Sequence, residues 1–129
     1  MQSLDVKRTI LLVDDEVAIV EVLSGILADE GFRVIVANNG AEGLRALDAD
    51  SVDVVLLDLM MPVMDGREML RELRARPAHV HRPVVLMSAA APSEGGDADP
   101  LTRFLRKPFD IEDLLGAIAQ VVAVAASLS

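Results

Sequence analysis

Residues Val52–Pro62 read VDVVLLDLMMP, an apolar run of strand length that ends in a carboxylate and soon reaches a proline. Valine and leucine at this density are typical of a strand buried on both faces, as in a parallel sheet. In open sheets of alternating strands and helices, ligands bind beyond the carboxyl ends of the strands. Asp58 lies at such an end. Taken alone, it would more often be a residue that ends a strand and caps a turn.

The length and composition of the chain indicate a single domain, residues 1–129, with a core over about residues 8–124. Hydrophobic residues make up 52% of the chain, which excludes an intrinsically disordered protein. The chain has no cysteine, so disulfides, thiolate metal sites and cysteine nucleophiles are excluded. The apolar runs are too short to span a membrane, and the first residues do not resemble a signal peptide. We therefore expect a cytoplasmic protein that does not insert into membranes.

The charge of the chain argues against direct binding of nucleic acid by this domain. Twelve basic residues stand against 21 acidic ones, which gives a net charge of −9. Phosphate backbones are bound by clustered lysine and arginine, and such a chain offers few of them. The aromatic residues are three phenylalanines, which leaves few platforms on which bases could stack.

Apolar runs of strand length alternate with segments of helical periodicity along the chain, an arrangement typical of parallel sheets covered by helices. The sequence predicts five strands, at Thr9–Val13, Arg33–Ala37, Val52–Leu57, Pro83–Ser88 and Thr102–Leu105. It predicts helices at Glu16–Glu30 and Ala41–Leu47, a third after the Asp65-Gly66 turn that ends before Pro77, and a last one over about Ile111–Val124. We therefore expect an α/β protein, a three-layer sandwich with a five-stranded parallel sheet.

The segment between the fourth and fifth predicted strands interrupts this alternation. Residues Ala89–Leu101 contain two prolines and two glycines, a composition typical of turns. Gly95 and Gly96 would each cost about 1 kcal/mol relative to alanine inside a helix. The fourth helix of the pattern, which should lie here, is therefore predicted to be short, disordered or absent.

Polar side chains follow four of the predicted strands. Asp14 and Asp15 follow the first strand, while Asp58, Ser88 and Lys107 follow the third, fourth and fifth. Parallel strands have their carboxyl ends at one edge of the sheet, so these side chains can converge. Clustered carboxylates repel each other unless a cation is present, and oxygen ligands with open water positions suit Mg²⁺. The sequence thus predicts a magnesium site that also holds one ammonium group.

These motifs together resemble the receiver domain of two-component response regulators. The resemblance rests on Asp14-Asp15 after a strand, Asp58 with Met61-Pro62 and Asp65-Gly66 behind it, Ser88 after a strand, and Lys107-Pro108-Phe109. It extends from about Arg8 to Val122, and the four motifs in this order are specific although each alone is weak. It implies a flavodoxin-like sheet of order 2-1-3-4-5, as in CheY.

The resemblance also implies a role for each site residue. Asp58 would accept a phosphoryl group from the phosphohistidine of a sensor histidine kinase or a phosphotransfer protein. Mg²⁺ would be bound by Asp15, Asp58 and the backbone carbonyl of Met60, and through water by Asp14. Lys107 would pair with the phosphoryl oxygens, Ser88 would move to hydrogen-bond one of them, and Phe104 would turn inward with it. The peptide bond Lys107–Pro108 would be cis. The output partner is left open.

Other interpretations are also compatible with parts of the sequence. The domain could be an interaction module of receiver fold that works without phosphorylation, or the receiver part of a larger DNA-binding response regulator. A small phosphatase with an aspartyl nucleophile is a third class, but the chain has no room for a cap domain over a substrate. We expect no enzymatic activity beyond the domain's own phosphorylation and dephosphorylation. His79 and His81 could be part of a metal site, but without a third ligand nearby we predict an exposed loop.

Overall fold

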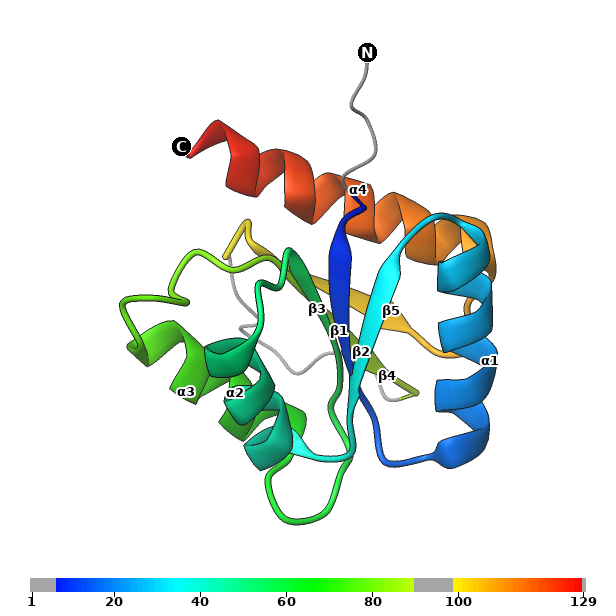
Figure 1. Cartoon of the computed structure of the whole chain (residues 1–129), viewed down its shortest axis with the longest axis horizontal. Helices are drawn as coiled ribbons and strands as arrows, with labels where there is room; N and C mark the ends of the chain where they lie inside the picture. The colour runs from blue at the N-terminus through cyan, green and yellow to red at the C-terminus, as the bar shows by residue number, and fades with distance from the viewer. Residues whose placement is uncertain (1–6, 90–98, 129) are drawn as a thin grey trace.

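The computed structural model describes residues 7–89 and 99–128, which form alternating strands and helices (Figure 1). The strands are β1 (Thr9–Val13), β2 (Arg33–Ala37), β3 (Val54–Asp58), β4 (Val84–Ser88) and β5 (Thr102–Arg106). The helices in the described residues are α1 (Val17–Asp29), α2 (Gly40–Ala49), α3 (Gly66–Ala75) and α4 (Ile111–Ser127). None of these helices is long and apolar enough to cross a membrane.

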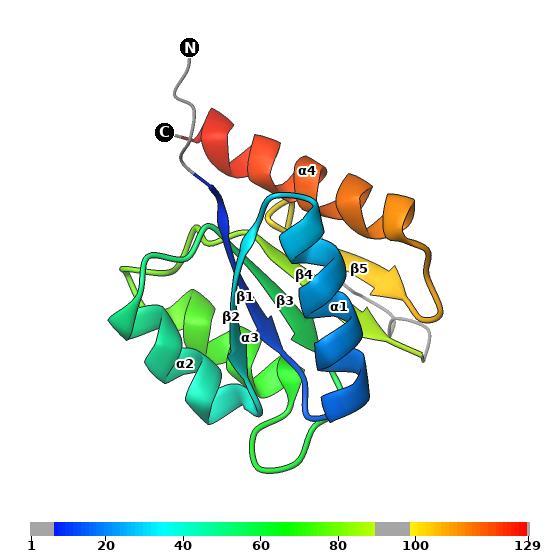
Figure 2. The ribbon, with the colours of Figure 1, turned by 45° about the vertical axis from the view of Figure 1, so that its right-hand side comes forward.

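The five strands form one parallel sheet in the order β2-β1-β3-β4-β5. Figures 1 and 2 show α2 and α3 on one face of this sheet and α1 and α4 on the other. Because both faces are covered, every residue of β1, β3 and β4 is buried. The side chains of each strand alternate between the two faces, so the core has two halves, one on each side of the sheet. The predicted architecture and strand order are confirmed.

The predicted elements are present, with differences at their ends. The third strand begins at Val54, two residues later than predicted, and includes Asp58. Just before it, the Asp53 carboxylate accepts a hydrogen bond from the Thr9 N–H over 2.7 Å. The last helix, α4, has 17 residues and runs to Ser127, three residues beyond the predicted end. This fourth helix of the described chain is neither short nor absent. The helix predicted to be short or absent precedes β5, and residues 90–98 of that segment lie outside the described residues.

Three helices begin with side-chain caps that the sequence places there. Asn39, Asp65 and Asp110 each accept a hydrogen bond from the backbone N–H three residues on, at 2.8 to 3.0 Å. Such a bond satisfies one of the unpaired N–H groups at a helix start. These caps fix where α2, α3 and α4 leave the edge of the sheet.

The prediction of an exposed loop around the two histidines is wrong for His79. Its side chain is buried, and its Nε2 lies 2.9 Å from Oδ1 of Asp48 on α2. Its Nδ1 lies 3.1 Å from the guanidinium of Arg82, which has only protons to donate, so Nδ1 accepts and Nε2 donates. The hydrogen bond from His79 lowers the pKa of Asp48. His79 thus ties α2 to the loop before β4, a packing role, whereas His81 is exposed as expected.

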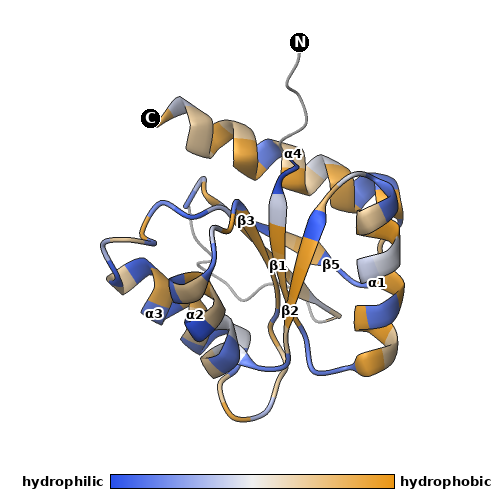
Figure 3. Ribbon diagram, viewed as in Figure 1, coloured by the Kyte–Doolittle hydropathy of each residue, from blue (hydrophilic) through white to orange (hydrophobic). Residues whose placement is uncertain are grey.

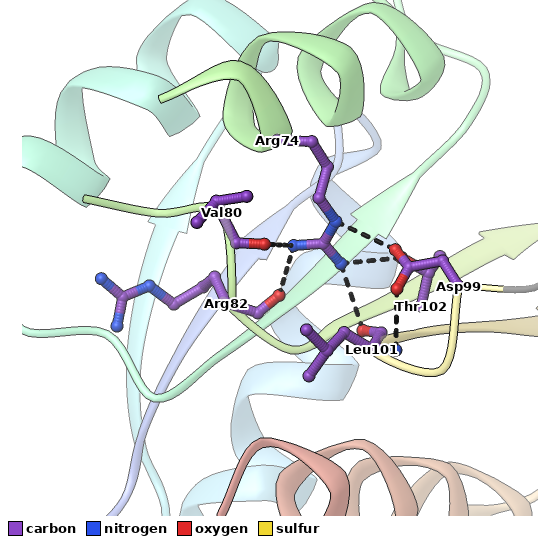
Figure 4. Close-up of polar contacts among 6 residues, drawn as sticks. All are labelled: Arg74, Val80, Arg82, Asp99, Leu101 and Thr102. Atoms are coloured by element: carbon purple, nitrogen blue, oxygen red, sulfur yellow. Dashed lines mark hydrogen bonds and ion pairs between the residues drawn. The ribbon is translucent and has the colours of Figure 1, made fainter. Parts of the chain in front are cut away.

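Arg74 holds the amino-terminal ends of β4 and β5 against α3. Its side chain is 20% exposed, and all five of its N–H groups have an acceptor (Figure 4). The acceptors are Asp99 Oδ2 at 3.0 Å, Thr102 Oγ1 at 2.8 Å and the carbonyl oxygens of Val80, Arg82 and Leu101 at 2.7 to 3.3 Å. One guanidinium therefore joins three segments that are distant in sequence.

Asp99 completes this network. Its carboxylate also accepts hydrogen bonds from the Thr102 hydroxyl at 2.7 Å and the Leu101 N–H at 3.0 Å. Burial alone would raise the pKa of Asp99, but these hydrogen bonds and the charge of Arg74 bring it below its ordinary value. The carboxylate is therefore ionised at neutral pH and forms a charged pair with Arg74.

We expect Arg74→Met to lower the free energy of unfolding by about 2–4 kcal/mol, because Asp99 and three carbonyl groups lose their partner. Arg71→Met, on the exposed side of the same helix, is the matched control and should change stability by less than about 0.5 kcal/mol. Urea unfolding followed by circular dichroism measures both variants. Equal stability of the two variants would contradict the role of Arg74.

Candidate functional site

The polar residues predicted to converge are brought together at the carboxyl ends of four neighbouring strands. Asp14 and Asp15 directly follow β1, Asp58 and Ser88 are the last residues of β3 and β4, and Lys107 directly follows β5. Backbone hydrogen bonds continue between the strands at this edge. The Leu59 N–H donates to the Met87 carbonyl at 2.9 Å, and the Lys107 N–H donates to the Ser88 carbonyl at 2.8 Å. The site is therefore built on the end of the sheet itself.

The site contains buried carboxylates beside one ammonium group. Asp14 and Asp58 are 0% and 3% exposed, whereas Asp15 is exposed. The Nζ of Lys107 lies 3.6 Å from Oδ2 of Asp14 and 3.6 Å from Oδ1 of Asp58. These distances allow electrostatic attraction but are too long for hydrogen bonds. A single lysine therefore faces both buried carboxylates.

The surroundings of Asp58 favour its protonated form. Burial, and next the negative charge of Asp14, raise its pKa from the ordinary value of 3.8 to about 6, although Lys107 and the Met60 N–H act in the opposite direction. The Met60 N–H donates to Oδ1 of Asp58 over 3.3 Å. The site thus holds more negative charge than its own residues neutralise, and a bound cation would lower this pKa.

Asp14, Asp15 and Asp58 form the cluster of acidic residues that could hold a metal ion, since each offers an oxygen within 4.8 Å of the others. Within the described residues, Oδ2 of Asp14 is buried without a hydrogen-bond partner. Its other oxygen, Oδ1, accepts a hydrogen bond from the Glu16 N–H at 3.0 Å. A buried carboxylate oxygen that accepts no hydrogen bond, beside two further carboxylates, fits a hard cation such as Mg²⁺.

Gly66, the first residue of α3, brings this helix into contact with the backbone of Asp58. A Cβ atom at Gly66 would lie 2.5 Å from the Asp58 carbonyl oxygen and 2.8 Å from the Cα of Leu59. The Gly66 N–H donates to the Leu59 carbonyl at 3.1 Å. Any side chain here would push the helix away from the end of β3. The sequence marked Gly66 as part of a turn, but its contact with the site was not predicted.

The loop between β3 and α3 contains a strained residue. Val63 has a φ of +71°, a conformation that β-branched residues rarely adopt, and the residue is 81% exposed. The Met64 N–H donates to the Pro62 carbonyl at 2.8 Å, so Val63 is the central residue of a three-residue turn. The loop is held on its other side by the Gly40 N–H, which donates to the Met64 carbonyl at 3.2 Å.

The remaining predicted site residues lie as follows. Ser88 is buried at the end of β4, and Met60 is 72% exposed beside Asp58. Phe104 is half-buried on β5, opposite Leu86 of β4, and packs on the side of the sheet covered by α2 and α3. The peptide bond Lys107–Pro108 is cis. All the predicted site residues except Phe104 thus lie at one edge of the sheet, and Phe104 lies on the strand that leads to it.

Comparison with known proteins identifies one family. The model of the response regulator receiver domain family matches residues 10–119. The CpxR homolog of Haemophilus influenzae, a transcriptional regulatory protein, is 39% identical over 127 residues, which cover 93% of this chain and 52% of that protein. CpxR of Escherichia coli K12 is 38% identical over 122 residues, which cover 88% of this chain and 48% of that protein. The chain thus spans about half the length of these relatives.

Solved structures of similar proteins have the same fold. Chemotaxis protein CheY4 of Vibrio cholerae matches with a TM-score of 0.81 and 29% identity, over 90% of this chain and 99% of that one. The receiver domain of the sensor kinase PA1611 of Pseudomonas aeruginosa matches with a TM-score of 0.80 and 27% identity, over 92% and 99%. That structure has a magnesium ion in its active-site cleft.

We expect Asp58→Asn to stabilise the metal-free protein at neutral pH. An acid whose pKa rises on folding binds its proton more tightly in the native state, so the free energy of unfolding falls as the pH rises from about 4 to about 6. Asparagine removes this penalty, so the variant should be about 1–3 kcal/mol more stable than the wild type at about pH 7.5 in EDTA.

Urea unfolding at about pH 7.5 and about pH 5 measures this difference, which should shrink at the lower pH. It should also shrink in about 10 mM Mg²⁺, because the ion binds and stabilises only the wild type strongly. Asp50→Asn, at an exposed carboxylate after α2, is the control. If Asp58→Asn were less stable than the wild type in EDTA, the repulsion argument would be wrong.

Proposed function

Because the chain belongs to the response regulator receiver domain family, we propose that Asp58 is the residue that accepts a phosphoryl group, with Mg²⁺ bound by the carboxylates beside it. The observation that carries this proposal is the position of Asp58, a buried carboxylate at the end of β3 between Asp14 and Lys107. Receiver domains interact with histidine kinases, and we infer that such a kinase or a phosphotransfer protein is the donor.

In the proposed reaction, an ionised oxygen of Asp58 attacks the phosphorus atom of a phosphohistidine. A phosphorus–oxygen bond forms, the phosphorus–nitrogen bond breaks, and the histidine leaves with the bonding electron pair. A metal ion held by Asp14, Asp15 and Asp58 would supply positive charge next to the phosphoryl oxygens. It would also keep Asp58 ionised at neutral pH, so no separate general base is needed.

Lys107 and Ser88 are proposed to bind the phosphoryl group after transfer. The Lys107 ammonium already faces the Asp58 carboxylate at 3.6 Å and carries three N–H donors. Ser88 is the end of the next strand, and its hydroxyl is the donor proposed to reach a phosphoryl oxygen. Phe104 lies on β5 beside β4, so a movement of Ser88 is proposed to change its packing. In this proposal the phosphoryl dianion favours one of two arrangements of Ser88 and Phe104.

An apolar groove beside Lys107 supports docking of a helical donor protein. It is lined by Ala18, Ile19, Val22, Leu23, Ala89, Lys107, Pro108 and Phe109. Val17 and Val22, on the same helix, are 70% and 60% exposed. Lys107, whose Nζ lies 3.6 Å from Oδ1 of Asp58, is one of the lining residues, so a partner bound in the groove would be close to Asp58. We propose this groove as the surface that recognises the phosphoryl donor.

The output of the domain in its full-length form is a separate proposal. The CpxR proteins that resemble the chain are about twice as long and are transcriptional regulatory proteins. We propose that this receiver likewise controls an output partner or domain by protein contact. The composition argues against contacts from this domain to DNA, since its net charge is −9.

Incubation with acetyl phosphate in Mg²⁺ should add one phosphoryl group to the wild type, detected as an intact-protein mass increase. The adduct should be absent in EDTA and in Asp58→Asn, because the first removes the cation and the second the nucleophile. Asp50→Asn should be modified like the wild type. An adduct that persists in Asp58→Asn would contradict the proposal. The interaction-module alternative requires that no adduct forms with either acetyl phosphate or a phosphorylated kinase.

A further inference from the structure

Met60 is the most exposed methionine in the part of the chain that the structure describes. The residue is 72% exposed, whereas Met69 and Met87 are 0% exposed. Met61 and Met64 are partly buried against the core. The chain has no cysteine, so its sulfur atoms are the thioethers of methionine. Because oxidation of methionine by a dissolved oxidant follows exposure, Met60 should react before the other described methionines.

The backbone holds Met60 next to the carboxylate of Asp58. The Met60 N–H donates to Oδ1 of Asp58 over 3.3 Å. The preceding residue, Leu59, is fixed on both sides: its N–H donates to the Met87 carbonyl at 2.9 Å, and its carbonyl accepts from the Gly66 N–H at 3.1 Å. The side chain of methionine is short, so the Met60 sulfur stays close to the place where a phosphoryl group on Asp58 would lie.

The loop that contains Met60 is mostly apolar. Figure 3 shows the loop between β3 and α3 largely in the colours of hydrophobic residues, whereas the loop between β1 and α1 is hydrophilic. Val63, in the same loop as Met60, is 81% exposed. A thioether is only a weak hydrogen-bond acceptor, and the side chain of valine has no polar atom. Neither Met60 nor Val63 therefore orients a water molecule beside Asp58.

We propose that Met60 is a site of reversible oxidation, and that its sulfoxide shortens the lifetime of a phosphoryl group on Asp58. The inference rests on the proposed function, because it needs the phosphorylated carboxylate. In the oxidation, hydrogen peroxide transfers one oxygen atom to the thioether. The sulfur–oxygen bond forms as the oxygen–oxygen bond breaks, the sulfur gives up an electron pair, and the second oxygen leaves as water. A methionine sulfoxide reductase reverses the change.

The sulfoxide changes how water is held beside the phosphoryl group. Oxidation converts an apolar side chain into a polar one, whose oxygen accepts hydrogen bonds. A water molecule that donates to this oxygen is positioned to attack phosphorus. A new phosphorus–oxygen bond forms, the bond from phosphorus to Asp58 breaks, the carboxylate keeps the electron pair, and the protons of the water leave with the phosphate. Because positioning a nucleophile lowers the barrier, peroxide would end the phosphorylated state sooner.

Peptide mapping by mass spectrometry after treatment with graded hydrogen peroxide tests the oxidation step. We expect the sulfoxide at Met60 to appear at less peroxide than at Met61 or Met64, and last at the two fully buried methionines. Fragment spectra distinguish these positions and also report on Met1, which lies outside the described residues. Oxidation of Met61 or Met64 before Met60 would overturn the assignment. Circular dichroism establishes that the oxidised protein is folded.

The lifetime is measured on protein that has been phosphorylated with acetyl phosphate in Mg²⁺ and then separated from the donor. Intact-protein mass, followed over time, gives the decay of the phosphoryl adduct. We expect the peroxide-treated wild type to lose its adduct at least about threefold faster than the untreated wild type. Treatment with methionine sulfoxide reductase should restore the slower decay.

Two substitutions at Met60 separate the sulfoxide from other effects of peroxide. Met60→Leu keeps an apolar side chain without sulfur, so its decay should not change with peroxide, although Met61 and Met64 can still be oxidised. Met60→Gln carries a permanent amide oxygen, so its adduct should decay fast without peroxide. If treated and untreated wild type decay alike, or if Met60→Leu responds like the wild type, the inference is wrong and the proposed function stands. Absence of an adduct in the untreated wild type would overturn both.

Discussion

The repulsion between the buried carboxylates of Asp14 and Asp58 is the constraint around which the functional edge of the sheet is built. Burial and the neighbouring charge raise the pKa of Asp58 to about 6, and one lysine at 3.6 Å from each carboxylate offsets only part of the charge. The burial of apolar side chains in the two halves of the core stabilises the fold and offsets the cost of this repulsion. The same repulsion favours binding of a cation. The pair of carboxylates that destabilises the metal-free fold is therefore the pair that would bind Mg²⁺.

The backbone, more than the side chains, fixes the geometry of this site. The hydrogen bond from the Lys107 N–H to the Ser88 carbonyl sets the position of the lysine relative to β4, and Gly66 lets α3 pack directly on the Asp58 carbonyl. The strained turn at Val63 lies in the loop that connects β3 to α3. Rigid elements position reactive groups better than loops do, because a shift of about 1 Å strongly reduces the rate of transfer. Asp58 is accordingly held by a strand, a helix start and a closed turn.

The sequence predicted a parallel sheet from its periodicity, and the edge at which the polar residues meet from the rule that parallel strands end on one side. The strand order was implied by the resemblance to receiver domains. Contacts that depend on distant segments were not predictable in this way. Arg74 looks like a surface residue of a helix, yet its five donors find acceptors in a loop and in β5, which are distant in sequence. His79 was expected in solvent because its partner Asp48 lies on α2, 31 residues away in the sequence. Local sequence patterns predict whether a segment is a helix or a strand and which of its faces is buried. The partners of individual side chains depend on tertiary packing.

The charged side chains are unevenly distributed between the edge of the sheet at Asp58 and the helix α4 that covers one of its faces. At the carboxyl ends of the strands, negative charge is concentrated and buried, where its field is strong and acts on a phosphoryl group or a cation. Helix α4, which covers one face of the sheet, has no charged side chain from Leu114 onward, and Arg8 lines the groove beside its carboxyl-terminal half. The fold therefore places three carboxylates at the edge where a phosphoryl group would bind, whereas α4 beyond its acidic first turn adds no charged side chain to the face that it covers.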